Sequence, residues 1–515
     1  MARDVFLGID IGTSGVKAIL VTESGDVVAA ATQALALSTP EPGWAEQHPE
    51  DWWQATLSAV RSVRETQPGL DVAAVGISGQ MHSSVFLDAH GDVIRPALLW
   101  CDGRTTAETS EITRRMGGEE RLSALACNPA LEGFTLPKVL WLRNHEPEAF
   151  ARLATVLLAK DYIRFRLTGT LATEPSDASG TLMYDTARRR WSRQILGAMD
   201  LPFSIVPDVG ESAAVHGCVT RAAAALTGLA EGTPVVGGGA DNACGAAGVG
   251  AIRPGEAVAS WGTSGTVLAP MTEPRVDPAL RAHTFCHVVP GMWYLMGVVL
   301  SAGGSFAWYR EQFAREFADS AMATRELTRE ATTIPPGAEG VMFLPYLQGE
   351  RTPHRDPALR GAILGLSLAH TRAHVTRAVL EGICFALNES VVILRELGLA
   401  PQYLLLTGGG ATEPLLRRLQ SDVFGLPVAT VNREEGPAYG AALLAAVGAG
   451  VFPDLGTAVS ATLSRSPLQR PDAEAHLRYQ QLFERFRAAA RCEKRYTERE
   501  WNSAPGRRIV DGKPG

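Results

Sequence analysis

The sequence predicts an α/β protein built from two similar domains. A short loop occurs twice, as Asp-Ile-Gly-Thr-Ser-Gly at Asp10–Gly15 and as Ser-Trp-Gly-Thr-Ser-Gly at Ser260–Gly265, half a chain apart. A chain of 515 residues exceeds what one hydrophobic core usually supports, so two or more domains are expected. Short apolar runs alternate with helical patterns along the chain, which is typical of an α/β layout.

Each copy of the loop is predicted to join two strands of a β-hairpin. Apolar and β-branched runs flank both copies, Val5–Ile9 and Val16 around the first and Val258–Ala259 and Val267–Leu268 around the second. Glycine permits close approach of the backbone to a ligand, and hydroxyl and N–H groups donate to phosphate oxygens. The candidate phosphate-binding residues are Gly12, Thr13, Ser14, Gly262, Thr263 and Ser264. Two such loops suggest two domains that hold a polyphosphate between them.

Composition and charge exclude several classes of function. Hydrophobic residues make up 46% of the chain and charged residues 20%, as in an ordinary globular protein. The net charge of −7 argues against a nucleic-acid or anionic-membrane partner, which would require a basic face. The longest uncharged apolar stretch, residues 439–452, is Gly-rich and fits a buried helix better than a membrane span.

The cysteines and the N-terminus indicate a cytoplasmic protein. The 7 cysteines are scattered, without Cys-x-x-Cys or metal-ligand spacing, so we expect reduced thiols. The first strand follows directly on the initial residues, so we expect no signal peptide.

The first half of the chain is predicted to open as a meander and to continue with short strands. Further strands are expected at residues 27–33, 72–78, 85–87, 97–100 and 235–236. The strand at 85–87 is expected to resume the strand at 72–78 after a kink. A helix is expected to begin at Pro49 and to bury two tryptophans, Trp52 and Trp53. The Gly-rich passage 237–245 is expected to form the seam between the domains.

The second half combines a long helix, a strand and a disordered tail. Residues 372–398 have helical periodicity, and a strand at 403–406 leads to Gly408–Gly410 and a helix at 415–420. From about residue 487 the chain is polar, basic and aperiodic, so we expect it to be poorly ordered.

Taken in order, these motifs resemble the FGGY family of carbohydrate kinases over residues 5–485. The resemblance rests on the two hairpin loops, the Gly-rich seam around Asp241 and the late Gly-Gly-Gly turn. Two longer stretches, residues 133–145 and 361–382, also match the family's signatures.

The resemblance implies a two-domain actin-like ATPase (ribonuclease H-like) fold with a deep interdomain cleft. It places an N-terminal sugar-binding domain at 1–246, a C-terminal nucleotide-binding domain at 247–485 and a disordered tail at 486–515. It also implies ATP as a substrate, Mg²⁺ as a cofactor and a small-molecule sugar as a partner, and it leaves open a homodimer.

Asp241 is the candidate catalytic base. Transfer of the γ-phosphoryl group to a sugar hydroxyl requires a phosphate cradle, a divalent ion and a carboxylate that orients the hydroxyl. Asp241 lies among glycines, where the chain can approach a substrate, and Asn242 can add a hydrogen bond to the same hydroxyls. The alternative is a helix N-cap in front of the small-residue run 243–249, and one residue can fill both roles. The family likeness favours catalysis.

Asp10 is the candidate metal ligand. A carboxylate beside a triphosphate is repelled unless a cation lies between them, so Mg²⁺ held partly through water is expected. The alternative is an Asp that only initiates the turn. Lys17 either neutralises phosphate charge or lies in solvent.

The Gly408–Gly410 turn is the candidate adenosine support. Neither glycine run continues as Gly-Lys-Ser/Thr, so the chain contains no Walker loop at these sites. By family likeness Gly408, Gly409 and Gly410 support the adenosine. The alternative is a turn that only allows close packing.

The candidate sugar-binding residues are Met81, His82, Asp102 and Arg104, with Asn242. His82 can donate to or accept from hydroxyls, and Met81 offers an adaptable apolar surface. Asp102 and Arg104 either bind further hydroxyls or hold each other as an ion pair. Trp100 packs against the sugar or, more simply, is a buried strand residue. Arg351 and His354 are left outside the candidate site.

The family members most similar in these stretches phosphorylate D-xylulose to D-xylulose 5-phosphate, and the resemblance implies that reaction here. Ribulose, gluconate and glycerol are the alternatives within the family. An actin- or chaperone-like ATPase that moves a partner protein is the alternative from another class. A sugar sensor without turnover is disfavoured because Asp10 and Asp241 are both present.

Overall fold

The chain divides by its internal contacts into two compact units. In this computed structural model, residues 4–317 and 319–503 are described. Unit 1 comprises Met1–Arg253, Pro270–Tyr294 and Val431–Ser464, and unit 2 comprises Pro254–Ala269, Leu295–Thr430 and Arg465–Gly515. The units therefore interleave along the sequence, whereas we expected one boundary after residue 246. The assignment of sugar and nucleotide binding to separate domains stays a prediction.

The sheet of unit 1 brings three parallel strand ends to one edge. Its strand order is β13-β14-β5-β1-β2-β3, and β15 pairs with β5. Strand β5 runs parallel to β1, with Ser78 opposite Asp10, and β15 runs parallel to β5, with Gly239 opposite Ser78. The strands are β1 (Asp4–Ile11), β2 (Gly15–Thr22), β3 (Val27–Ala34), β5 (Asp71–Gly79), β13 (Val215–Cys218), β14 (Pro234–Val236) and β15 (Gly239–Ala240). The segments after β1, β5 and β15 therefore begin side by side.

The expected first hairpin is confirmed. Strands β1 and β2 pair antiparallel, with Ile11 opposite Val16, so the Gly-Thr-Ser segment forms the connecting loop. The expected helix at Pro49 is α1 (Pro49–Thr66), in which Trp52 and Trp53 are buried as expected.

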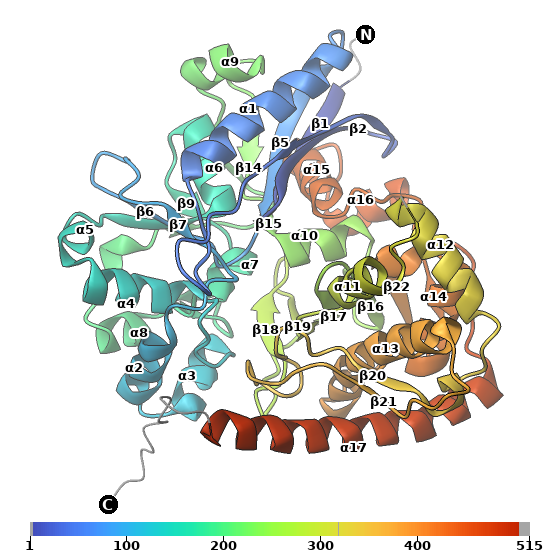
Figure 1. Cartoon of the computed structure of the whole chain (residues 1–515). Helices are drawn as coiled ribbons and strands as arrows, with labels where there is room; N and C mark the ends of the chain where they lie inside the picture. The colour runs from blue at the N-terminus through green and yellow to red at the C-terminus, as the bar shows by residue number, and fades with distance from the viewer. Residues whose placement is uncertain (1–3, 318, 504–515) are drawn as a thin grey trace, which may run out of the picture. The chain divides into compact units, whose positions relative to one another are not determined.

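Two helices cover opposite faces of this sheet, α1 and α15 (Pro437–Gly448) (Figure 1). Helix α15 approaches the strands very closely. A Cβ atom at Gly8 would lie 2.0 Å from the carbonyl oxygen of Ala438, and one at Gly76 would lie 1.9 Å from that of Ala441. Glycines in the sheet and alanines in the helix therefore permit this contact. The expectation of a buried helix in this stretch is confirmed.

Unit 1 also contains a four-stranded sheet of order β4-β7-β6-β8. These strands are β4 (Glu46–Gln47), β7 (Ala97–Leu98), β6 (Ser84–Leu87) and β8 (Thr155–Leu158). Strand β6 belongs to this sheet, so it does not resume β5 as we expected. The chain leaves β5 through a turn at residues 80–83, and His82 there has a φ of +69°. The expected strand at 97–100 is shorter, because only β7 (Ala97–Leu98) pairs with neighbours and Trp100 lies in a turn.

The remaining elements of unit 1 are short. The strands are β4 (Glu46–Gln47), β6 (Ser84–Leu87), β8 (Thr155–Leu158), β9 (Ala172–Thr173), β10 (Tyr184–Asp185), β11 (Arg190–Trp191), β12 (Asp208–Val209) and β18 (His283–Cys286). The helices are α2 (Thr106–Met116), α3 (Glu119–Ala126), α4 (Thr135–His145), α5 (Pro147–Ala151), α6 (Ala159–Thr168), α7 (Pro175–Ala178), α8 (Arg193–Ala198), α9 (Arg221–Thr227), α10 (Asp241–Gly248) and α16 (Leu455–Thr462).

Unit 2 repeats the arrangement of the first hairpin. Its larger sheet contains the strand order β19-β17-β16-β22-β23, in which β19 is Trp293–Val299 and β23 is Val428–Ala429. Strands β16 (Glu256–Trp261) and β17 (Gly265–Met271) form the expected second hairpin, with Trp261 opposite Gly265. Strand β22 (Tyr403–Gly408) runs parallel to β16, as β5 does to β1.

The other elements of unit 2 include the expected long helix. The strands are β19 (Trp293–Val299), β20 (Met342–Leu344), β21 (Ala362–Leu364) and β23 (Val428–Ala429), and the helices are α11 (Gly303–Phe313), α12 (Ser320–Ala331), α13 (Arg372–Glu396), α14 (Pro414–Phe424) and α17 (Ala473–Ser503). Helix α17 extends through residues 486–503, which we expected to be disordered, and residues 504–515 of that expected tail lie outside the described residues. Among the described residues, no helix combines the length and apolar character that crossing a bilayer requires.

Candidate active site

Asp10 and Asp241 come together at the parallel strand ends of unit 1. Asp10 lies at the end of β1, and Asp241 directly follows β15. Both strands pair with β5 at the same residue, Ser78. The two carboxyl groups are close enough that the charge of Asp10 raises the pKa of Asp241. The structure therefore unites the two acidic residues that the sequence singled out.

Asp241 has the acidity of a base that works near neutral pH. Its side chain is only partly exposed, and burial raises its pKa to about 7, with a further contribution from the charge of Asp10. Three hydrogen bonds oppose this rise. The backbone N–H and the side-chain amide of Asn242 donate to Asp241 Oδ1 at 2.7 and 3.0 Å, and the backbone N–H of Met81 donates to the same carboxyl group. A pKa near the working pH suits a group that accepts a proton during reaction.

Asp241 does not cap helix α10 with its side chain. It is the first residue of α10, the N-cap position is Ala240, and its Oδ1 accepts from the adjacent Asn242. The start of a helix favours negative charge there. The preceding glycines allow the chain to pass close to β5, because a Cβ atom at Gly238 would lie 1.8 Å from the carbonyl oxygen of Ile77.

The Asp10 carboxyl group is suited to bind a cation whose other ligands come from elsewhere. Its Oδ1 atom is buried and has no hydrogen-bond partner among the described residues. Burial raises the pKa of Asp10 to about 6, and the nearby Ser78 hydroxyl and Lys17 charge oppose that rise. Within the described ranges, no group of three or more His, Cys, Asp and Glu side chains is placed to hold a metal ion. An ion beside Asp10 would therefore need water or phosphate oxygens, as Mg²⁺ commonly does.

The Thr13 side chain fixes the first hairpin loop to its surroundings. Its hydroxyl donates to Gln80 Oε1 at 3.0 Å and accepts from Trp100 Nε1 at 2.9 Å. Ser14, in contrast, is exposed at the tip of the loop. Trp100 thus supports the loop from a turn, a role that its sequence context did not indicate.

Met81 and His82 line a buried wall beside Asp241. Asn242 Nδ2 lies 3.5 Å from Met81 Sδ, and His82 Nδ1 lies 2.6 Å from the carbonyl oxygen of Gly180. Because a carbonyl only accepts hydrogen bonds, Nδ1 of the imidazole carries a proton and donates it to Gly180 O. A Cβ atom at Gly180 would lie 2.8 Å from the imidazole and 3.1 Å from Met81 Cε, so glycine is needed there.

Aromatic residues complete this wall, and the sequence did not identify them. The His82 ring centroid lies 4.5 Å from that of Phe134 and 5.7 Å from that of Phe285, and Phe285 packs against Tyr294 at 5.6 Å. Phe134 falls in the stretch 133–145, so the family signature could have indicated it. Phe285 and Tyr294 carry no sequence signal of this kind.

Asp102 and Arg104 form a buried ion pair. Arg104 Nη2 lies 2.7 Å from Asp102 Oδ2, and Arg104 Nη1 lies 2.8 Å from Glu46 Oε1. Asp102 also accepts from the backbone N–H of Ala45 at 2.7 Å, and the Arg104 guanidinium lies 3.6 Å from the ring centroid of Trp44. This is the second of the two alternatives for the pair, and direct contact with a sugar stays a prediction.

In unit 2 the second hairpin loop and the glycine turn lie together. Gly408 is opposite Trp261 in the β16–β22 pair, and a Cβ atom at Gly410 would lie 2.7 Å from the Trp261 side chain. The backbone N–H groups that begin α11 hold the loop, since Gly303 donates to Gly262 O at 2.8 Å and Gly304 donates to Thr263 O at 2.9 Å. Gly262, Thr263, Gly408 and Gly409 are exposed. The structure thus brings together both sets of predicted nucleotide contacts in this unit.

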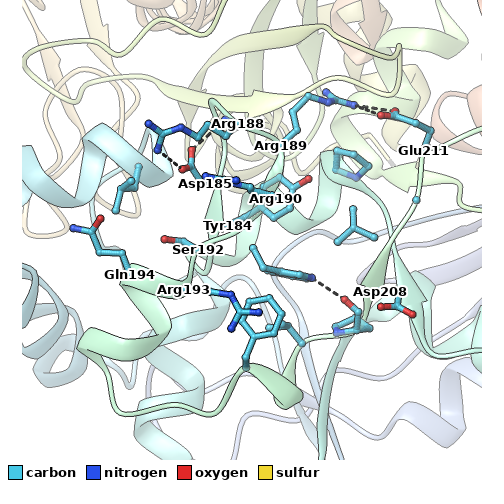
Figure 2. A pocket seen from close by; sticks show the side chains of 18 residues that line it. Tyr184, Asp185, Arg188, Arg189, Arg190, Ser192, Arg193, Gln194, Asp208 and Glu211 are labelled. Atoms are coloured by element: carbon cyan, nitrogen blue, oxygen red, sulfur yellow. Dashed lines mark hydrogen bonds and ion pairs between the residues drawn. The ribbon is translucent and has the colours of Figure 1, made fainter.

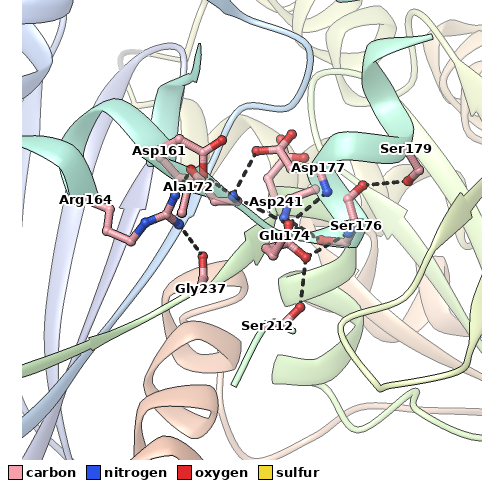
Figure 3. A network of polar contacts seen from close by, with 12 residues as sticks. Asp161, Arg164, Ala172, Glu174, Ser176, Asp177, Ser179, Ser212, Gly237 and Asp241 are labelled. Carbon is pink, nitrogen blue, oxygen red and sulfur yellow. Dashed lines mark hydrogen bonds and ion pairs between the residues drawn. The ribbon is translucent and has the colours of Figure 1, made fainter. Parts of the chain in front are cut away.

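A buried network of charges supports the strand that precedes Asp241 (Figure 3). Ser176 Oγ accepts from the backbone N–H of Ala240 at 3.0 Å and donates to Glu174 Oε1 at 2.7 Å. Lys160 Nζ lies 3.5 Å from both Glu174 and Asp177. The further members of the network are Asp161 and Arg164.

In this network the pKa of Asp177 is shifted upward. Burial raises its pKa well above the ordinary value, and the negative charges of Asp161, Glu174 and Asp241 contribute, against the opposing charge of Lys160. Sequence reasoning missed this network, because its members are scattered single charges.

A separate cavity of about 670 Å³ lies between α7, β10, α8 and β12 of unit 1 (Figure 2). Four arginines line it, and two of them are paired, Arg188 with Asp185 at 3.1 Å and Arg189 with Glu211 at 2.9 Å. None of the predicted site residues lines this cavity.

Neighbouring carboxylates, a loop that carries hydroxyl groups and a wall that contains Met81 and His82 fit the parts of a phosphotransferase. Residues 5–248 match the N-terminal domain model of the FGGY family of carbohydrate kinases, and residues 257–449 match its C-terminal domain model. The chain therefore belongs to the FGGY family of carbohydrate kinases. The family uses ATP, so the chain is an ATP-dependent phosphotransferase.

Relatives match almost the whole chain. The xylulose kinase of Bacillus subtilis (strain 168) is 40% identical over 484 residues, 93% of this chain and 95% of the relative. The xylulose kinase of Escherichia coli (strain K12) is 40% identical over 487 residues, 94% of this chain and 98% of the relative. The crystal structure of xylulose kinase from Rhodospirillum rubrum superposes with a TM-score of 0.88 at 31% identity, covering 96% of this chain and all of that one. The expected two-domain α/β fold is thereby confirmed.

Proposed function

We propose that this chain transfers the γ-phosphoryl group of ATP to the 5-hydroxyl of D-xylulose, giving D-xylulose 5-phosphate and ADP. The observation that carries the proposal is the 40% identity to xylulose kinases over nearly the whole length of the chain. The meeting of Asp10, Asp241 and the Met81–His82 wall at one sheet edge supports it.

Asp241 acts as the general base in this proposal. Its carboxylate accepts a hydrogen bond from the 5-hydroxyl, turns the hydroxyl oxygen toward the γ-phosphorus and takes the proton as the new O–P bond forms. The bond from the γ-phosphorus to the β,γ-bridging oxygen breaks, and that oxygen leaves with ADP. A pKa of about 7 means that a useful fraction of Asp241 is ionised at neutral pH.

Asp10 holds Mg²⁺ in this proposal, in part through water. When bound, Mg²⁺ neutralises negative charge on the phosphates. Asp10 offers one buried oxygen, Oδ1, that has no hydrogen-bond partner among the described residues. Because Mg²⁺ is octahedral, its other ligands would be oxygens of ATP and water.

The remaining site residues bind and orient the two substrates. Met81, His82 and Asn242 form the wall for the sugar, and the Asp102–Arg104 pair either meets the sugar or holds the loop at Ala45 beside it. The phosphates bind to Gly12, Thr13 and Ser14 in one loop and to Gly262, Thr263 and Ser264 in the other, and the adenosine binds to Gly408–Gly410. The sugar thereby belongs to the N-terminal domain and the nucleotide mainly to the C-terminal domain.

The decisive experiment measures ADP release by the purified chain with a panel of sugars. We expect slow hydrolysis of ATP alone and a large acceleration by D-xylulose. Acceleration by ribulose, gluconate or glycerol but not by xylulose would keep the kinase class and overturn the substrate. Turnover indifferent to every sugar but stimulated by a polypeptide would favour the chaperone-like alternative. A cytoplasmic location and a homodimer stay predictions. Cell fractionation would test the location, and a mass measurement in solution would test the oligomeric state.

A further inference from the structure

The signature stretch 133–145 contacts His82 from three of its residues. This stretch forms the turn before α4 and the helix itself, and Thr135 and Lys138 are completely buried. Lys138 Nζ donates to the carbonyl oxygen of His82 at 2.9 Å, and Thr135 Oγ1 donates to the same oxygen at 3.3 Å. The Phe134 ring packs against the imidazole at 4.5 Å between centroids. The motif is therefore directed at one residue of the proposed sugar wall.

The backbone of His82 has a conformation that requires support. Its φ of +69° lies in the left-handed region, which is strained for a residue with a Cβ atom. In that conformation the carbonyl receives three side-chain donors, since Ser84 Oγ also donates to it at 3.2 Å. Such strain persists only where the surroundings over-determine it.

A buried ammonium group is well suited to this support. Burying a charge is costly unless strong hydrogen bonds compensate for it. Lys138 Nζ also donates to the carbonyl oxygen of Gly133 at 2.8 Å, so it ties the turn before α4 to the turn after β5. Its compact head with three donors can serve both carbonyls at once.

We propose that Lys138 and Thr135 are positioning residues that hold His82 in its left-handed conformation and so present the imidazole to the sugar. The proposal rests on the proposed function, because it takes His82 as a sugar contact. The hydrogen bonds to the His82 carbonyl fix the backbone of that residue, and the fixed backbone places its imidazole.

The test is a double-mutant cycle on the purified full-length chain, with D-xylulose and ATP as the varied substrates. The single variants are Thr135→Val, Lys138→Met and His82→Ala, and each of the first two is combined with His82→Ala. We expect Thr135→Val and Lys138→Met to raise the KM for xylulose by roughly five- to hundredfold, the range for a lost buried hydrogen bond. The KM for ATP should stay within about twofold, since the second hairpin is untouched.

Coupling is the readout that a merely structural role would not produce. In the His82→Ala background, Thr135→Val and Lys138→Met should change the KM for xylulose by less than about twofold, because the side chain they position is gone. Thr135→Ser keeps the donor and should retain the wild-type KM. Thr56→Val is the matched control, since Thr56 is a buried threonine on α1 whose hydroxyl donates to Trp52 O at 2.7 Å and not to His82. It should leave the KM unchanged.

The outcomes distinguish failure of the positioning role from failure of the proposed sugar site. If His82→Ala leaves the KM for xylulose unchanged, then His82 is no sugar contact, and both this inference and that part of the proposed site are overturned. If His82→Ala raises the KM while the other variants are silent or purely additive with it, only the positioning role is overturned. If the Thr135 or Lys138 variants have a lower melting temperature but show no coupling to His82→Ala, the positioning role alone is likewise overturned. Should Lys138→Met not fold, the Thr135→Val cycle decides the question alone.

Discussion

At the scale of single residues, Asp241 combines two properties that the proposed reaction needs. It lies at a strand end where the backbone is open to a ligand, and its pKa is raised to about 7 by burial and by Asp10. A fully exposed Asp would be ionised but too weak a base for efficient proton transfer. The same environment therefore places Asp241 and adjusts its acidity.

Replacing Asp241 by Asn should remove the base while preserving the shape of the site. We expect kcat to fall by about 10²–10⁴-fold, the usual contribution of a positioned base. ATP binding should be largely retained, since the glycine loops are unchanged. Steady-state kinetics and nucleotide titration check this expectation. A variant that keeps more than about a tenth of the wild-type kcat would exclude Asp241 as the base.

The same substitution should stabilise the protein, and more so at high pH. A carboxyl whose pKa rises on folding, from 3.8 to about 7 here, gives stability that is fully present below pH 3.8 and lost as the pH rises through 7. Asn carries no such charge. The gain in melting temperature of Asp241→Asn over wild type should therefore increase between pH 5 and pH 8.5, in ligand-free protein. A gain that is independent of pH would contradict the raised pKa.

Gly180 should be a determinant of sugar affinity although it has no side chain. A Cβ atom there would lie 2.8 Å from the His82 imidazole and 3.1 Å from Met81 Cε, so Gly180→Ala must displace both side chains. Because small displacements in a site cost much binding and rate, we expect the KM for xylulose to rise roughly tenfold or more. Gly197→Ala is the control, since a Cβ atom there meets nothing within 4 Å. Equal KM values for both variants would rule out this wall as the sugar contact.

At the scale of elements, close packing of α15 on the sheet fixes the strands that end at the site. The contact is backbone to backbone, because a Cβ atom at Gly76 would lie 1.9 Å from the carbonyl oxygen of Ala441. Strand β5, which carries Gly76, leads directly to Met81 and His82. The glycine and alanine pattern of these elements therefore serves the geometry of the site as well as stability.

Gly76→Ala should accordingly destabilise unit 1. Neither backbone can give way without moving a helix or a strand, so we expect a loss of about 1–3 kcal/mol or more in the free energy of unfolding. Gly69→Ala provides the control, because a Cβ atom at Gly69 meets nothing within 4 Å. Denaturant titration of both variants measures the difference. Similar stabilities would mean that α15 can move away from β5 without loss.

The elements also show which local signals suffice for prediction. The hairpins, α1, α13 and β22 follow from strong periodicity or flanking turns, and these elements lie where the sequence predicts them. Strand β6 was misplaced because Gly79–His82 resembles a kink within one strand, whereas a positive φ at His82 sends the chain to another sheet. Helix α17 was missed over residues 486–503 because its polar composition resembles that of a disordered tail.

At the scale of the whole molecule, the sequence predicts those site residues that belong to short local motifs. Asp10 lies at the end of β1, Met81 and His82 lie in the turn after β5, and Asp241 follows β15. The parallel pairing of these three strands makes the residues neighbours. The network of Lys160, Glu174 and Asp177 could not be predicted, since pairing between distant charges depends on the finished fold. Phe285 is a further example, as it reaches His82 from a segment that follows the second hairpin.

The repeated loop makes a prediction that concerns both units. A Cβ atom at Gly12 would meet only the carbonyl oxygen of Gly15, at 3.1 Å, and one at Gly262 only that of Ser264, at 3.4 Å. The Gly12 contact is tight, but it is with a carbonyl of the same loop, and neither glycine has the contacts below 2 Å that Gly76 and Gly238 would make. A ligand that approaches the backbone explains a glycine at both positions.

Gly12→Val and Gly262→Val should then fold normally and each lose nucleotide affinity or turnover. A larger side chain at either loop would hold the phosphates away from the backbone N–H groups, so we expect roughly tenfold or greater losses, given that a 1 Å misplacement can cost about 10²-fold. Melting temperatures within a few degrees of wild type would show that the fold is intact, and ADP titration and kcat would measure the function. If one variant is silent while folded, that loop does not contact the phosphates, and the repeat of the hairpin reflects only the architecture of the two units.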